Sequence, residues 1–66
     1  MNIILNGETY SIEAECTAEK LIARLGLHES KFAVEINGEI LTRSAYARHG
    51  VQAGDRIEII HAVGGG

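Results

Sequence analysis

The sequence predicts a small α+β domain in which a mixed sheet of four to five strands carries one helix packed on one face. Two Asn-Gly pairs, at 6–7 and 37–38, each lie between two apolar runs, and this pattern is the strongest short signal for a β-hairpin. Between the two hairpins, residues 17–26 repeat apolar side chains with the period of a helix. An alternating run at 56–63 follows, and the order hairpin, helix, hairpin and strand favours one sheet covered by one helix.

The first hairpin is predicted to have strands at about residues 2–6 and 8–13. Successive side chains of a strand point to opposite faces, so Ile3 and Leu5 share one face and Ile4 lies on the other. The same alternation places Phe32 on one side of its strand together with Val34 and Ile36. The helix is expected to meet these residues of the sheet: Ile3, Leu5, Ile12, Val34, Ile36, Ile57 and Ile59.

The helix has a predicted beginning and a predicted end. Thr17 can cap the free N–H groups of the first turn with its hydroxyl oxygen. Gly26 stands where a glycine commonly ends a helix, because glycine accepts a positive φ there. Such a short helix is not stable alone and must lie on the sheet. Its apolar stripe consists of Ala18, Leu21, Ile22 and Leu25.

The length and composition of the chain limit the kinds of function that it can have. A chain of 66 residues forms one domain with a small core, predicted over 1–63 with a flexible glycine tail at 64–66. The single cysteine, Cys16, forms no internal disulfide and fits a reducing, cytoplasmic setting. The net charge of −3, without a basic cluster, argues against nucleic-acid binding. No apolar run reaches the length of a membrane span.

The tail is the main functional candidate. The apolar run stops at Val63, and Gly64, Gly65 and Gly66 follow. Glycine has no Cβ, so this tail is narrow enough to enter a slot that any side chain would block. It would offer the Gly66 carboxylate to a partner enzyme, while Gly64 and Gly65 thread through the active site of that partner.

A docking face is predicted beside the tail. The side of the sheet without a helix would expose Ile4 and Ile60 as neighbours, with Ala62 and Val63 close by. Exposed apolar patches commonly mark interaction sites, although scattered surface isoleucines are also ordinary. We therefore predict that Ile4, Ile60, Ala62 and Val63 contact a partner.

No residue of the chain shows a pattern of catalysis or metal binding. Glu13, Glu15 and Glu19 surround Cys16 in sequence and oppose a thiolate, so Cys16 is interpreted as structural. The three histidines lack the spacing of metal ligands. His28 and His49 are interpreted as solvated loop residues, and His61 either as a partner contact or as a surface strand residue.

The residues carry a family resemblance. The hairpin 34–44, the Gly54-Asp55 turn before the last strand and the Val63-Gly64-Gly65-Gly66 ending resemble the ThiS sulfur carriers of thiamin biosynthesis, and the resemblance covers the whole chain. It implies the β-grasp (ubiquitin-like) fold, in which the first and last strands lie side by side in the centre. Proline often stands in this family where the chain has Thr42. The molybdopterin carrier MoaD is similar in fold and tail but typically longer.

The resemblance implies a carrier and not an enzyme. A ThiF-like adenylyltransferase would activate the Gly66 carboxylate with ATP, and a cysteine desulfurase system would supply the sulfur. A ThiG-like thiazole synthase would take sulfur from the thiocarboxylate. The carrier itself would bind no cofactor, and the ATP would be used by the adenylating enzyme. Alternatives left open are a carrier for molybdopterin or tRNA thiolation, a ubiquitin-like protein modifier, and an interaction module with an inert tail.

Overall fold

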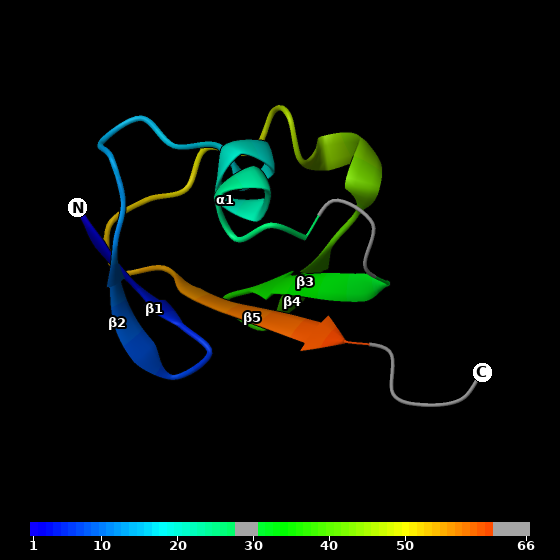
Figure 1. Ribbon diagram of the computed structural model, residues 1–66, viewed down its shortest axis with the longest axis horizontal. Helices are drawn as coiled ribbons and strands as arrows, with labels where there is room; N and C mark the ends of the chain where they lie inside the picture. Colours follow the sequence, from blue (N-terminus) through cyan, green and yellow to red (C-terminus); the bar gives the residue numbers. More distant parts are fainter. Residues whose placement is uncertain (28–30, 62–66) are drawn as a thin grey trace.

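The computed structural model describes residues 1–27 and 31–61. Its elements form a single sheet with a helix across one face (Figure 1). None of the helices in these two ranges is long and apolar enough to cross a membrane. In chain order the elements are β1 (Asn2–Leu5), β2 (Glu8–Ser11), α1 (Ala18–Arg24), β3 (Phe32–Ile36), β4 (Glu39–Leu41), the 3₁₀ turn η1 (Arg43–Ala45) and β5 (Arg56–His61).

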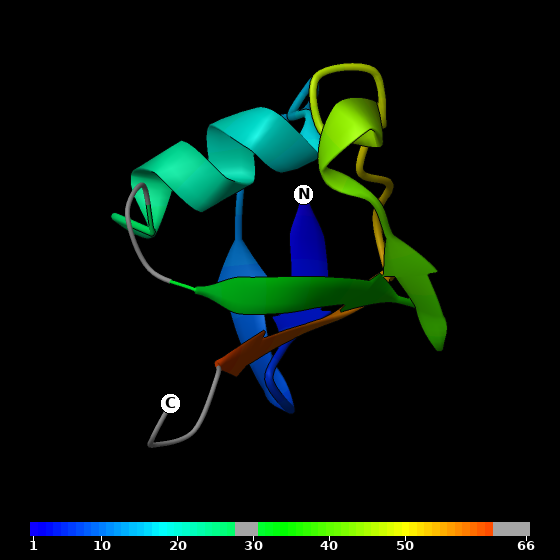
Figure 2. The same cartoon turned by 90° about the vertical axis from the view of Figure 1, so that its right-hand side faces the viewer.

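The sheet has five strands in the order β2-β1-β5-β3-β4. β5 is the central strand, parallel to β1 and antiparallel to β3. Figure 2 shows α1 lying over one face of this sheet, and no helix of the described residues covers the other face. The predicted α+β class and the pairing of the first strand with the last are therefore confirmed.

Both predicted hairpin turns are present. Asn6 and Gly7 have φ values of 49° and 84°, and Asn37 and Gly38 have values of 52° and 88°. Positive φ at both central residues is the conformation of a type I′ turn, whose twist matches that of the strands it joins. These turns set the registers Leu5↔Glu8 and Ile36↔Glu39.

The helix begins and ends where the sequence predicts. Thr17 is the N-cap, and its Oγ1 accepts a hydrogen bond of 3.2 Å from the Lys20 N–H. Gly26 has a φ of 74°, and the Leu27 N–H donates to the Ile22 carbonyl at 3.3 Å. This bond pattern is a Schellman motif, which satisfies carbonyl groups at the helix end.

The core lies between α1 and the sheet. Ala18, Leu21 and Ile22 of the helix are buried, as predicted, while Leu25 is partly buried. Two residues of the loops complete the core: Cys16 before the helix and Val51 after η1, which are joined by a hydrogen bond of 2.8 Å from the Val51 N–H to the Cys16 carbonyl. The buried residues of the sheet and its flanking loop are Ile3, Ile12, Val34, Ile36, Ile57 and Ile59.

The segment after β4 forms a 3₁₀ turn at Arg43–Ala45. Tyr46 follows it and stacks on Phe32 with ring centroids 6.5 Å apart. This stack ties the segment to the start of β3, near the end of the sheet where β5 finishes.

Replacing Thr42 with proline should stabilise the fold. Thr42 has a φ of −73°, which a proline ring would fix without strain, and it follows an extended strand residue. The gain should be about 0.4–1 kcal/mol, because proline restricts the unfolded chain. Urea unfolding checks this, with Thr42→Ala as the control for losing the 3.3 Å contact between the Thr42 and Ser44 hydroxyls. A lower stability for Thr42→Pro than for Thr42→Ala would contradict the prediction.

Candidate functional site

β5 is the element that leads to the predicted glycine tail. It pairs with β3 from Ile57 to His61 and with β1 at Arg56 and Ile57, and its last described residue, His61, lies opposite Phe32 of β3. The ladder with β3 therefore holds β5 up to its last described residue. The predicted functional residues Ala62, Val63, Gly64, Gly65 and Gly66 lie outside the described residues, so their roles stay predictions.

The two hairpin asparagines hold β5 from opposite sides. Asn6 Oδ1 accepts a hydrogen bond of 2.9 Å from the Ile59 N–H, and the Asn6 N–H donates to the Ile57 carbonyl at 2.9 Å. Asn37 Oδ1 accepts from the Arg56 N–H at 2.9 Å. From the sequence, both asparagines were predicted only as turn residues. Their side-chain bonds to N–H groups of β5 join residues far apart in the chain, and such bonds leave no local sequence pattern.

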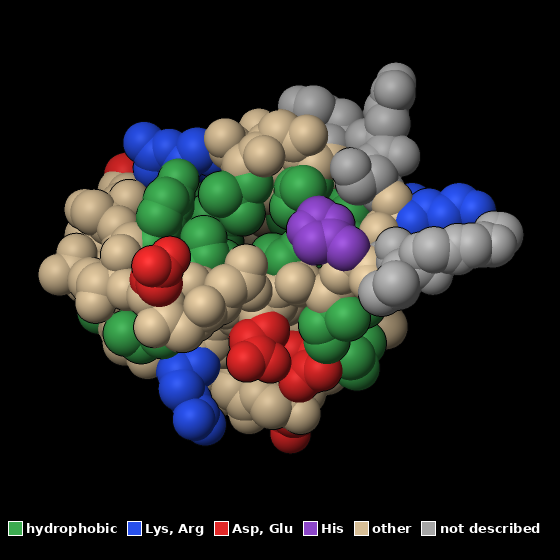
Figure 3. Space-filling view, turned by 60° about the horizontal axis from the view of Figure 1, so that its bottom comes forward, with side chains coloured by type: hydrophobic (Ala, Val, Ile, Leu, Met, Phe, Trp, Pro, Cys, Tyr) green, Lys and Arg blue, Asp and Glu red, His purple; other side chains and the backbone are tan. Residues whose placement is uncertain are grey.

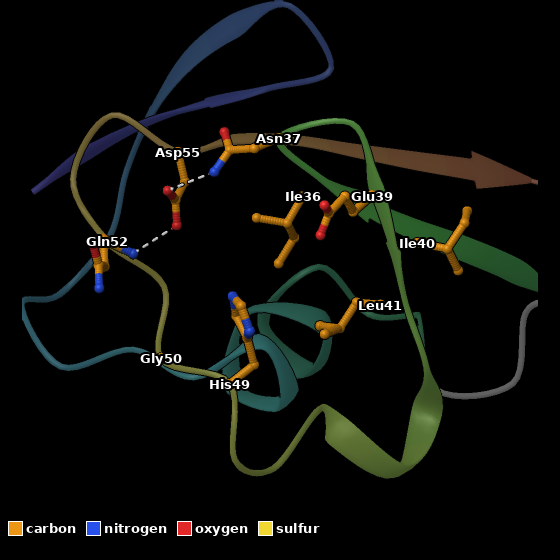
Figure 4. A pocket seen from close by; sticks show the side chains of 9 residues that line it. All are labelled: Ile36, Asn37, Glu39, Ile40, Leu41, His49, Gly50, Gln52 and Asp55. Atoms are coloured by element: carbon orange, nitrogen blue, oxygen red, sulfur yellow. Dashed lines mark hydrogen bonds between the residues drawn. The ribbon is translucent and has the colours of Figure 1, made fainter.

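Asp55 completes the support at the start of β5. Its Oδ1 accepts from Asn37 Nδ2 at 3.0 Å, and its Oδ2 accepts from the Gln52 N–H at 2.8 Å (Figure 4). One carboxylate thus joins the second hairpin to the 52–55 turn. The register of the tail-bearing strand is fixed by side chains as well as by the sheet ladder.

Asn6→Gly should reduce the free energy of unfolding by about 1–2 kcal/mol, because the Ile59 N–H loses its acceptor. Glycine accepts the φ of 49° at this position, so the substitution adds no backbone strain. Urea unfolding measures the change. Ala53→Gly, at an exposed turn position, controls for the added freedom of the unfolded chain. Equal losses for the two variants would show that the Asn6 amide contributes nothing.

The face of the sheet without the helix is called here the open face, and it carries the outward residues of β1, β5, β3 and β4. Two of them are large exposed apolar side chains: Ile60 with 45% of its surface exposed, as predicted, and Ile40 with 63%. Figure 3 tilts the underside of the sheet forward and shows hydrophobic, acidic and basic side chains side by side. By register and alternation, the open face comprises Ile4, Arg56, Glu58, Ile60, Ala33, Glu35 and Ile40.

The predicted neighbourhood of Ile4 and Ile60 is wrong. Both lie on the open face, but Ile4 is level with Arg56, and Ile60 lies four residues further along β5, about 13 Å away at the usual strand rise. Ile4 is also half-buried. The residue opposite Ile60 is Ala33, so the apolar part of the open face lies toward β3 and β4.

Ile40 is an exposed residue that the predicted docking face did not include. The signal was present, because alternation places Ile40 opposite in direction to Leu41, which packs against the core. Pairing with Glu35 then sets Ile40 on the open face.

Cys16 is a core residue, as interpreted. Burial raises the pKa of the Cys16 thiol, and the nearby Glu13 carboxylate raises this pKa further. A thiol that resists ionisation is a weak nucleophile, so the geometry favours packing over sulfur chemistry at this residue.

Two of the three histidines lie in the described part of the chain. His61 is exposed at the end of β5, and His28 lies outside the described residues. His49 lies in a loop, as interpreted, and its side chain is half-buried. Within residues 1–27 and 31–61, no three His, Cys, Asp or Glu side chains are grouped so that they could hold a metal ion.

His49 lines a cavity of about 520 Å³ between the second hairpin and the 49–55 loop (Figure 4). In Figure 4 the Ile40 side chain points away from the other lining side chains. Two polar side chains that line the cavity, Asn37 and Asp55, hydrogen-bond to each other. These lining residues belong to the support of β5 described above.

Comparisons with known proteins agree with this architecture. The ThiS family model matches residues 3–66. The sulfur carrier protein ThiS of Escherichia coli K12 is 32% identical over the full length of both chains. The crystal structure of the thiamine biosynthesis protein ThiS from Geobacter metallireducens superimposes with a TM-score of 0.86 at 30% identity, again over the whole of both chains.

A longer relative matches as well. The thiazole synthase of Paramagnetospirillum magneticum is 42% identical over 66 residues, which are 100% of this chain and 20% of that protein. The chain thus spans about a fifth of the length of the thiazole synthases that it matches. Together with the five-stranded sheet, the family match over residues 3–66 shows that the chain belongs to the ThiS family, the family of the sulfur carrier protein of thiamin biosynthesis.

Proposed function

We propose that this chain carries sulfur on its Gly66 carboxylate for the formation of the thiazole ring of thiamin. One observation supports this above the others: the ThiS family match extends through the glycine tail to residue 66. The chain would act as a carrier and co-substrate, with catalysis supplied by its partners. The raised pKa of the buried Cys16 thiol supports this division, because the chain's own cysteine is a poor sulfur nucleophile.

The proposed chemistry solves a leaving-group problem. A carboxylate is a poor electrophile, because oxide leaves badly. In the proposed first step, the Gly66 carboxylate attacks the α-phosphorus of ATP on a ThiF-like adenylyltransferase, and pyrophosphate leaves. The terminal sulfur of a persulfide then attacks the acyl carbon and displaces AMP. A second thiol then attacks the partner's sulfur in the remaining S–S bond and forms a disulfide with it. The Gly66 thiocarboxylate leaves, and a ThiG-like synthase would consume it.

The body of the protein presents the tail to both enzymes. β5 pairs with β1 at its start and with β3 up to His61, and Asn6 accepts from its Ile59 N–H, so the strand that leads to the tail keeps one position relative to the open face. Glycine at 64 and 65 leaves only backbone for a partner groove to enclose. Extended backbone can pair with such a groove through its N–H and C=O groups.

The relatives support the proposed partnership with a thiazole synthase. A region similar to this whole chain occupies a fifth of two proteins named thiazole synthase. A carrier domain within a synthase would deliver its sulfur at high effective concentration. We infer that this chain serves the same reaction class with a ThiG-like enzyme, in the cytoplasm, and that a cysteine desulfurase system supplies its sulfur.

Intact-mass spectrometry tests the proposal. The chain is incubated with a ThiF-like enzyme, ATP, cysteine and a cysteine desulfurase. We expect a species heavier by the exchange of one oxygen for one sulfur, localised to a C-terminal peptide that contains Gly66. An unchanged mass with no trapped adenylate would overturn the proposal. Covalent attachment of Gly66 to lysines of other proteins would instead identify a protein modifier.

A further inference from the structure

Two glutamates lie directly opposite each other in the middle of the open face. Glu35 of β3 lies directly opposite Glu58 of β5 in the antiparallel register. Directly opposed residues of such a pair have Cβ atoms about 4.5–5.5 Å apart. Like charges at this separation destabilise a sheet, so the pair is a local cost that the fold alone does not explain.

Neither glutamate forms an ion pair within the described part of the chain. The single ion pair among residues 1–27 and 31–61 joins Arg24 and Glu13, at 3.5 Å on the other side of the molecule near the helix. Arg56 lies on the open face next to Glu58 but forms no ion pair with it. Glu35, Gly38, Arg56 and Glu58 line a hollow of about 150 Å³.

The exposed isoleucines flank the two carboxylates. Ile40 lies opposite Glu35 on the β4 side, and Ile60 lies two residues beyond Glu58 on β5, facing Ala33. The 63% and 45% exposed side chains thus border a negatively charged centre. Apolar groups around a charged contact exclude water from it, which is the usual surrounding of a strong contact in a protein interface.

We propose that the open face docks on the adenylating enzyme through an arginine of that enzyme, whose guanidinium lies between Glu35 and Glu58 while Ile40 and Ile60 pack against apolar groups around it. This inference rests on the proposed function, since it assigns the docking partner of the same carrier. Compared with the predicted docking face, the proposed surface keeps Ile60 and has Ile40 of β4 in place of Ile4 of β1.

The two glutamates that line the hollow favour an arginine side chain over a lysine side chain as the bound group. Arginine presents five N–H donors in a planar fork and can bond two carboxylates at once, whereas lysine is a compact point charge. Binding of the cation would also relieve the repulsion between Glu35 and Glu58. A second copy of this chain is a poorer occupant, because it would bring another pair of carboxylates to the same surface.

The test measures binding of the full chain to the ThiF-like enzyme by calorimetry, at low and physiological salt. Glu35→Gln/Glu58→Gln removes both charges and keeps the side-chain size. We expect its affinity to fall by about tenfold or more and its salt dependence to weaken. Its melting temperature should equal or exceed that of the unmodified chain, because the like-charge pair is gone. Arg56→Gln should bind at least as tightly as the unmodified chain.

Glu8→Gln/Glu39→Gln is the matched control. It makes the same change in net charge on two exposed strand residues that pair with Leu5 and Ile36 and so point away from the open face. We expect binding within twofold of the unmodified chain. Equal weakening of both double variants would overturn the proposal, because it would show only a general charge effect.

Three further outcomes would also overturn it. The first is unchanged affinity of Glu35→Gln/Glu58→Gln, and the second is weaker binding of Arg56→Gln. The third is a dimer of the chain in sedimentation that either variant dissolves, because the open face would then be a self-interface. Sulfur loading of the unmodified chain separates the two proposals: loading with unchanged affinity of the double variant refutes the docking contact alone, and no loading refutes the proposed function.

Discussion

Deletion of Gly66 should abolish sulfur loading while the fold remains intact. The shortened chain still ends in a glycine carboxylate, but that carboxylate lies about 3.5 Å short of its place in the partner. Misplacement of a reacting group by even 1 Å can cost about 100-fold in rate, so we expect a loss of at least about 100-fold. Gly65→Trp should cause a loss of similar size, because its side chain would block a slot shaped for backbone.

Loading is measured by intact mass after incubation with the adenylating enzyme, ATP and the sulfur source. Ala53→Trp is the control for a bulky residue, because Ala53 lies at an exposed turn at the other end of β5. It should load at the normal rate. All three variants should melt at the temperature of the unmodified chain. Normal loading of the Gly66 deletion variant would mean that the carboxylate chemistry is not confined to residue 66.

Local patterns were sufficient to predict most of the fold. The Asn-Gly turns, the Thr17 cap and the Gly26 stop are each encoded within a few residues, and each forms as expected. Alternation assigned Val34, Ile57 and Ile59 to the core face correctly. These features depend on backbone preferences and on the period of the side chains, which a single sequence displays directly.

Features set by long-range pairing were not predictable in the same way. The register of β1 against β5 depends on the 52–55 turn, where the Ile4 N–H donates to the Asp55 carbonyl at 2.9 Å. That hydrogen bond joins residues far apart in the chain. The register that it sets places Ile4 level with Arg56 and therefore far from Ile60. Burial of Val51 and the opposition of Glu35 and Glu58 are likewise consequences of tertiary placement. The sequence therefore predicted Ile60 on the candidate docking surface, whereas its pair of glutamates emerged only from the structure.

Ile59→Asn and Ile60→Asn should have opposite consequences although the two residues are adjacent. Ile59 is buried against the core with 8% of its surface exposed, and Ile60 lies on the open face with 45% exposed. Asparagine at 59 loses the burial of an isoleucine side chain and leaves an amide without partners, a combined cost of about 4–6 kcal/mol. A domain of this size has a total stability of about 3–10 kcal/mol, so we expect Ile59→Asn to be largely unfolded.

Ile60→Asn should stay folded, with a loss of at most about 1 kcal/mol, because its side chain is exposed at a surface position. Circular dichroism and urea unfolding distinguish the two variants, and asparagine adds no charge that would confuse the reading of binding. Ile60→Asn should bind the adenylating enzyme more weakly, since an apolar contact at the edge of the interface is lost. Unfolding of Ile60→Asn would place Ile60 in the core and invert the assignment of faces along β5. Normal stability together with normal binding would remove Ile60 from the docking surface and leave Ile40 as its apolar contact.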